Sequence, residues 1–187
     1  DGYASLGSNV PQVLVMHDLS FEHFKDQVAF LTLKYYEYYM PRFARKARRI
    51  ATVSEYSKAD IVKHYGIDPS RIDVVYNGAK EVYAPATAVV KSRLTKDGDY
   101  FIYVGSIHPR KNIVNLLKAF ELFKRTTQSP VKLVLAGRKA WDFEEVDRTW
   151  QQMQFKNDVT FLGHVPPAEL GERVSAALAM VYVSLFE

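Results

Sequence analysis

Short apolar runs alternate along this chain with longer stretches in which apolar residues recur at the spacing of a helix. A short continuous apolar run is typical of a strand that is buried on both faces of a parallel sheet. Such runs predict strands at residues 13–16, 50–53, 72–76, 101–104, 131–136, 159–162 and 180–184. The longer stretches predict helices at about residues 28–47, 54–64, 113–123, 143–155 and 168–179. Strands and helices that alternate in this order indicate a parallel α/β architecture.

The helix predicted at residues 54–64 carries characteristic residues at both ends. Ser57 and Asp60 have the spacing of a capping box, which supports a helix start near Ser57. Gly66 follows the last periodic residues, and glycine commonly ends a helix. The preceding helix ends in a run of cations from Arg42 to Arg49, where the helix dipole favours positive charge.

The periodicity fades between about residues 80 and 96, where small and mixed polar residues surround Pro85. This composition predicts a linker at residues 81–96, between a first α/β series at 1–80 and a second at 97–187. The first series is short, and no helix follows the last predicted strand of the second. We therefore expect the chain to be a segment of a larger two-domain protein.

Composition excludes several classes of protein. The chain has 187 residues, of which 48% are hydrophobic and 25% charged, as expected for a globular protein with a buried core. It has no cysteine, which excludes disulfides, thiolate metal sites and cysteine nucleophiles. No apolar run is long enough to span a bilayer, and the first residues do not resemble a signal peptide. A net charge of +4 is too small to indicate nucleic-acid binding by itself.

The best candidate binding segment follows the strand predicted at residues 101–104. Ligands of open parallel sheets bind beyond the carboxyl ends of the strands. Here the strand runs into Gly105, then into a loop with Arg110 and Lys111, and then into Asn112 as the expected N-cap of a helix. The helix N-terminus and the two cations would suit a phosphate. The residues alone equally allow solvated loop charges, and the segment is neither a Walker loop nor a G-x-G-x-x-G motif.

A series of short segments in a fixed order runs through nearly the whole chain. They are His17-Asp18-Leu19 and residues 52–61, 75–78, 103–112, 116–120, 135–137, 161–165 and 183–187. Together these segments resemble the motifs of the retaining family-4 glycosyltransferases. The resemblance implies a GT-B fold, in which two Rossmann-like domains face each other across a cleft. Residues 1–80 would then belong to the acceptor-side domain, and residues 97–187 to the nucleotide-sugar domain.

The resemblance also implies which residues bind the donor diphosphate. Lys111 would neutralise it, Arg110 would be a second cation, and Gly105 would let the backbone approach a phosphate closely. Many family members have an arginine directly after this glycine, whereas this chain has Ser106. The second cation of the family's clamp would therefore have to come from Arg110.

Further residues are implied at the nucleobase and at the sugar. The stretch from His164 and Val165 to Leu170 resembles the loop that packs along the nucleobase. Glu187 matches the first glutamate of the family's E-x7-E motif, which bonds sugar hydroxyls, and His17 matches a histidine that faces the donor sugar. By their residue types alone, His17 could instead be a hydrogen-bonded core histidine and Glu187 a solvated terminal residue.

Side chains that could bind a metal show no ligand spacing in the sequence. His64, His108 and His164 are scattered, and we interpret them as structural or surface residues. Asp97 and Asp99 form a D-x-D sequence, the metal motif of a different glycosyltransferase fold. These two residues precede a strand and so lie at the edge of the sheet away from the ligand crevice. We therefore expect no metal site.

The resemblance implies a retaining transferase that moves a sugar from a nucleotide-sugar donor to a sugar or lipid-linked acceptor in polysaccharide biosynthesis. It implies no cofactor, no required metal and no nucleic-acid partner. The alternatives are a non-catalytic nucleotide-binding Rossmann-like module and a dinucleotide-dependent oxidoreductase. We expect a cytoplasmic protein whose run from Arg42 to Arg49 either contacts anionic lipid weakly or is a solvated helix end.

Overall fold

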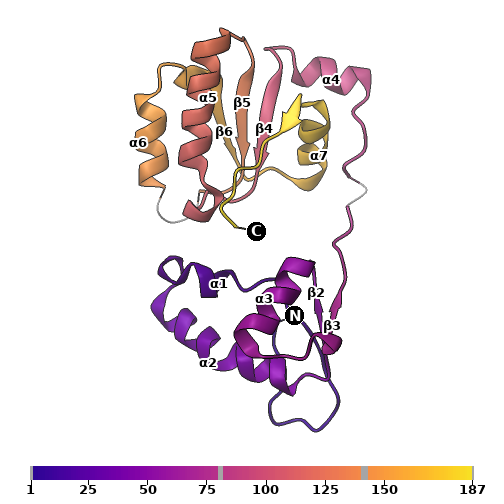
Figure 1. Ribbon diagram of the computed structural model, residues 1–187. Helices are drawn as coiled ribbons and strands as arrows, with labels where there is room; N and C mark the ends of the chain where they lie inside the picture. The colour runs from indigo at the N-terminus through magenta and orange to yellow at the C-terminus, as the bar shows by residue number, and fades with distance from the viewer. Residues whose placement is uncertain (1, 80–81, 140–142, 187) are drawn as a thin grey trace. The chain divides into compact units, whose positions relative to one another are not determined.

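The alternating apolar runs and amphipathic stretches fold as parallel sheets that carry helices, which confirms the α/β prediction (Figure 1). The computed structural model describes residues 2–79, 82–139 and 143–186. The chain divides into two compact units, Asp1–Gly78 and Ala79–Phe186, and each unit is described by itself.

The first unit contains a parallel sheet of three strands in the order β1-β2-β3. Its elements are β1 (Val13–Val15), α1 (Ser20–His23), η1 (Lys25–Gln27), α2 (Phe30–Lys46), β2 (Arg49–Thr52), α3 (Glu55–Tyr65), η2 (Pro69–Arg71) and β3 (Ile72–Val74). Leu14 pairs in register with Ile50, and Ile50 with Ile72, so that three buried side chains form a row across the sheet. Phe43 of α2 and Ile61 of α3 belong to the same buried cluster.

The start of α3 corrects the capping-box prediction. The N-cap is Ser54, whose backbone is extended and whose Oγ accepts a hydrogen bond from the N–H of Ser57 at 3.0 Å. Ser57 therefore lies within the first turn and is buried. Asp60 pairs with His23 and does not cap the helix N-terminus. The predicted end is confirmed, because Gly66 adopts a left-handed φ of 65° and its N–H caps the helix.

The second unit contains a parallel sheet of four strands in the order β6-β5-β4-β7. Its elements are α4 (Ala88–Leu94), β4 (Tyr100–Val104), η3 (Pro109–Lys111), α5 (Ile113–Thr127), β5 (Lys132–Ala136), α6 (Glu144–Gln152), η4 (Lys156–Asp158), β6 (Val159–Gly163), α7 (Pro167–Ala176) and β7 (Ala179–Met180).

Helices cover both faces of this second sheet (Figure 1). Successive side chains of a strand point to opposite faces. Accordingly, Tyr103 of β4 packs in one cluster with Leu117 of α5 and Val146 of α6. Its neighbour Ile102 packs in a second cluster with Ala176 of α7. Both clusters are buried, which accounts for the continuous apolar run in this strand.

A short helix that the sequence pattern did not predict, α4, forms within the linker predicted at residues 81–96. Thr87 caps the helix by accepting a hydrogen bond from the N–H of Val90 at 3.3 Å. Leu94 joins the buried cluster that contains α7 residues, and Arg93 pairs with Glu172 of α7 at 2.5 Å. The helix is too short for its periodicity to be recognised in the sequence, and packing against α7 stabilises it.

The last strand is shorter than the predicted strand at residues 180–184. After Val181, whose N–H donates to the carbonyl of Ile102 at 2.8 Å, the chain leaves the sheet. Its later backbone N–H bond is to the loop before α5, where the N–H of Leu185 donates to the carbonyl of Arg110 at 2.9 Å. The final residues are therefore held by that loop and not by strand pairing.

Within the described residues, no helix is long and apolar enough to cross a membrane. In the basic run, Arg42 stacks on the ring of Tyr38, with its Cζ 3.5 Å from the ring centroid. Arg49 donates a 2.7 Å hydrogen bond from Nε to Asp73, and this bond lowers the pKa of the Asp73 carboxyl. Arg49 is thus ion-paired within the protein. Contact of the run from Arg42 to Arg49 with lipid stays a prediction.

Candidate functional site

The carboxyl ends of three neighbouring strands, β4, β5 and β6, border a pocket of about 360 Å³ in the second unit. The loops after these strands, the start of α7 and the segment before α4 form its wall. The lining residues are Val82, Tyr83, Val104, Gly105, Ser106, Ala136, Gly137, Arg138, His164, Val165, Pro167 and Leu170. The pocket has the size of a small-molecule site and lies where ligands of parallel sheets bind.

Part of the predicted donor-binding set meets in this pocket. The predicted residues that line it are Gly105, His164, Val165 and Leu170. They are far apart in sequence, but parallel pairing of β4 with β5 and of β5 with β6 brings the ends of the strands to one edge. Arg110 and Lys111 do not line the pocket. Donor binding by any of these residues stays a prediction.

Two glycines let the ends of β4 and β5 approach each other. A Cβ on Gly137 would lie 1.7 Å from the carbonyl oxygen of Gly105, which a real side chain could not do. Gly105 has a positive φ of 152°, and a Cβ there would lie 2.7 Å from the hydroxyl of Tyr103. That hydroxyl donates to the carbonyl of Ser106 at 3.1 Å. Gly105 therefore has a structural reason to be glycine beside its predicted role.

The loop between β4 and α5 is a tight turn. The N–H of Arg110 donates to Nδ1 of His108 at 3.3 Å, which caps η3. Asn112 occupies the N-cap position of α5, as predicted, but its side chain makes no capping bond because the residue is left-handed with a φ of 59°. Its Nδ2 instead donates to the carbonyl of Val183 at 3.0 Å. The side chain thus links the turn to the final segment of the unit.

The two predicted cations of this turn have different surroundings. Nη1 of Arg110 donates to the carbonyl of Phe186 at 2.7 Å, so this guanidinium holds the final segment of the unit. Lys111 is buried, and its Nζ lies 5.8 Å from the ring centroid of Tyr182. The Tyr182 hydroxyl donates to the carbonyl of Val104, a residue of the pocket wall, at 2.9 Å. Lys111 is therefore connected to the pocket rim through Tyr182.

Sequence reasoning missed Arg138, which lines the pocket two residues after β5 ends. Its side chain is exposed and has no hydrogen bond or ion pair with any residue that the structure describes. The same rule that selected the loop after β4 applies to the loop after β5, and it could have identified this arginine. A guanidinium in this position is available to an anionic ligand.

Two known protein families match the chain, one in each half. Residues 2–81 match the family "Glycosyltransferase Family 4", and residues 86–187 match the family "Glycosyl transferases group 1". The second match covers more than half of the chain. The chain belongs to the glycosyl transferases group 1 family. The family resemblance of the sequence motifs is thereby confirmed.

Several relatives of this glycosyltransferase chain are known. It is 30% identical to O-antigen chain mannosyltransferase B of Escherichia coli over 94% of the chain and 47% of that protein. It is 26% identical to O-antigen chain mannosyltransferase RfbU of Salmonella typhimurium, over 94% and 46% of the respective lengths. The chain thus spans about half the length of the curated relatives it matches.

A solved structure supports the fold of the glycosyltransferase chain. Anabaena Alr3699/HepE in complex with UDP-glucose superposes with a TM-score of 0.74 at 20% identity, over 93% of this chain and 47% of that protein. At this identity the likeness concerns the fold alone. Together with the family match, it confirms the predicted class of Rossmann-like units of the GT-B type.

The remaining predicted site residues of the glycosyltransferase chain lie elsewhere. His17 follows β1 in the first unit and is exposed, so the alternative of a core histidine was wrong. Glu187 lies outside the described residues. Asp97 and Asp99 precede β4, at the end of the strand opposite the pocket, as predicted.

In the sequence His64 shows no metal-ligand spacing and is interpreted as a structural or surface residue, whereas the structure places it beside Asp60 and His23. The spacing of four residues between Asp60 and His64 puts both on one face of α3 and could have indicated the contact. His23 comes from α1, and its proximity depends on the tertiary fold.

Gly137→Ala should destabilise the second unit and reduce the pocket, because its Cβ would meet the carbonyl of Gly105. We expect a loss of about 1 to 3 kcal/mol in the free energy of unfolding, as for an overpacked core, measured by urea denaturation. Gly78→Ala is the control, since nothing lies within 4 Å of a Cβ at that position. Equal stability of the two variants would contradict the close approach of β4 and β5.

Proposed function

We propose that the pocket at the ends of β4, β5 and β6 binds a nucleotide-sugar donor, and that the whole protein transfers this sugar to an acceptor with retention of configuration. The observation that carries the proposal is that one pocket unites predicted donor-binding residues from the loops after β4 and β6. Family membership supports the transferase activity. The complex of the Anabaena neighbour with UDP-glucose supports the chemical class of the donor.

The shape of the pocket suggests how the donor is held. Its lining near His164, Val165 and Leu170 is suited to the flat face of a nucleobase. The diphosphate would lie toward the loop after β4, next to the exposed Arg138 of the pocket lining, and Lys111 of that loop would contact it although this lysine does not line the pocket. We assign the second cation to Arg138 in preference to Arg110, because Arg110 already donates to the carbonyl of Phe186.

Catalysis would come from stabilising the departing diphosphate by cations as the sugar acquires oxocarbenium character. The family motifs that His17 and Glu187 match imply contacts with the donor sugar, and in this proposal the leaving phosphate accepts the proton of the acceptor hydroxyl. No metal takes part in transfer. The names of the two O-antigen mannosyltransferases support a hexose such as mannose as the sugar, and a growing polysaccharide as the acceptor.

Lys111→Ala should weaken the binding of a nucleoside diphosphate by about ten- to a hundredfold, because a charge-assisted contact is worth roughly 1.5 to 3 kcal/mol. Calorimetry with UDP, GDP and ADP would measure this change and identify the preferred base. Arg138→Ala should also weaken binding, whereas Arg125→Ala, on the exposed end of α5, should not. Unchanged affinity in Lys111→Ala would refute the assignment of this lysine.

Nucleoside diphosphate binding should survive an excess of chelator. The D-x-D residues lie at the end of β4 opposite the pocket, so they cannot bridge a metal to a diphosphate bound there. The measurement compares the dissociation constant with and without EDTA, for the unchanged chain and for Asp97→Asn with Asp99→Asn. The metal-free proposal would be overturned if binding required Mg²⁺ or Mn²⁺ in the unchanged chain and this metal dependence were absent in the double variant.

The 187-residue chain should bind donor but transfer sugar only at a rate near background. It spans 47% of mannosyltransferase B, so we infer that the complete protein supplies further groups to the transition state. A transfer assay with a panel of nucleotide sugars would compare this chain with a version extended to the length of its relatives. Equal turnover by both would show that the 187 residues are sufficient, and donor binding without turnover by either would favour a non-catalytic nucleotide-binding module.

A further inference from the structure

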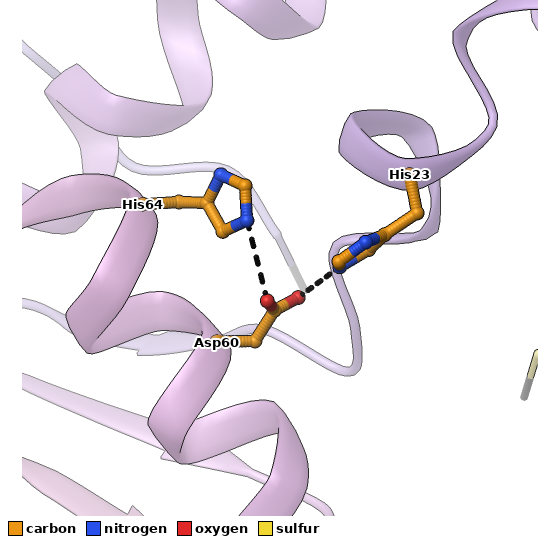
Figure 2. Close-up of side chains that lie close together, drawn as sticks. All are labelled: His23, Asp60 and His64. Atoms are coloured by element: carbon orange, nitrogen blue, oxygen red, sulfur yellow. Dashed lines mark hydrogen bonds and ion pairs between the residues drawn. The ribbon is translucent and has the colours of Figure 1, made fainter.

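Two helices of the first unit meet at a cluster of three side chains (Figure 2). His23 lies in the last turn of α1, and Asp60 and His64 lie one turn apart on α3. Nε2 of His23 is 2.7 Å from Oδ2 of Asp60, and Nε2 of His64 is 3.3 Å from Oδ1 of the same carboxylate. Both imidazoles therefore direct the same ring nitrogen toward one carboxyl group.

The burial of the cluster is uneven. The side chain of Asp60 is 6% exposed, whereas those of His23 and His64 are each 27% exposed. A buried carboxylate requires a cation or several hydrogen-bond donors as partners. The partly exposed rings leave a path by which a small cation could reach the carboxylate from solvent.

The donor atoms form a set that suits a borderline divalent metal. Two imidazole nitrogens and one carboxylate oxygen are common ligands of zinc. These three atoms all lie within 4.8 Å of one another. Zinc bonds of about 2.0 to 2.1 Å would place the ligands of a tetrahedral site roughly 3.3 Å apart. Small side-chain rotations would therefore suffice to form the site.

The surroundings also favour a cation. The hydroxyl of Tyr65, the residue after His64, donates a hydrogen bond of 3.5 Å to Oε1 of Glu22, the residue before His23, so a second carboxylate lies near the cluster. The Nζ of Lys25 lies 3.3 Å from Glu22 and also pairs with Glu37, so its single positive charge is shared between two carboxylates.

We propose that His23, Asp60 and His64 bind one zinc ion, with a water molecule as the fourth ligand. The ion would crosslink α1 to α3. Because α1 begins at Ser20, directly after the loop that contains His17, the ion would restrict the movement of that loop. The site takes no part in the transfer chemistry and does not depend on the proposed donor pocket.

Calorimetric titration of the metal-free 187-residue chain with ZnCl₂ tests the proposal. We expect one ion per chain, a zinc-dependent rise in the melting temperature, and visible d–d absorption when Co²⁺ replaces zinc. His64→Gln keeps a hydrogen-bond donor for Asp60 but removes the imidazole ligand. Its zinc affinity should fall by at least about tenfold, since loss of even an outer-shell partner costs about that much.

His23→Gln should have the same effect and tests the site from the other helix, in case one variant fails to fold. His108→Gln is the matched control, because this histidine lies in the second unit and outside the donor-binding set, and its zinc affinity should be unchanged. Absence of stoichiometric zinc binding would overturn the proposal. Equal zinc affinity of His64→Gln, His23→Gln and the control would overturn it as well, since the ion would then bind elsewhere.

Discussion

The close approach of Gly137 to the carbonyl of Gly105 is the constraint on which the candidate pocket depends. It lets the N–H of Gly105 donate to Ala136, and the N–H of Gly137 donate to Gly163, at 2.9 and 2.8 Å. These bonds continue the sheet past the ends of its strands. As a result, the loops after β4, β5 and β6 open together at one edge, and residues far apart in sequence share one wall.

Several residues near this edge serve structure and proposed function together. Arg110 holds the final segment of the second unit through the carbonyl of Phe186, and Lys111 lies over Tyr182 of the same segment. A cation that binds backbone is less available to a ligand, which is why we propose Arg138, whose side chain has no partner among the described residues, as the second cation.

In the first unit, too, a loop that follows a strand carries polar residues. Its exposed His17 follows β1, and the short helix α1 that comes next is tied to α3 through Asp60. The histidine cluster thus connects the loop after one strand to the helix after the next strand. In both units, a rigid parallel sheet positions loops whose polar residues can meet a ligand.

The sequence by itself determined the α/β class, most of the strands and helices, and the family, because buried parallel strands leave short continuous apolar runs and each family motif is contiguous in the sequence. The family motifs in the sequence also singled out Gly105, His164, Val165 and Leu170 as donor-binding residues, and all four line the pocket, although their binding of a donor stays a prediction. Only the tertiary structure decided that α4 forms, that Arg110 binds the final segment, and that His23 reaches Asp60. These three outcomes depend on contacts between residues distant in the chain, and local propensity carries no information about such contacts.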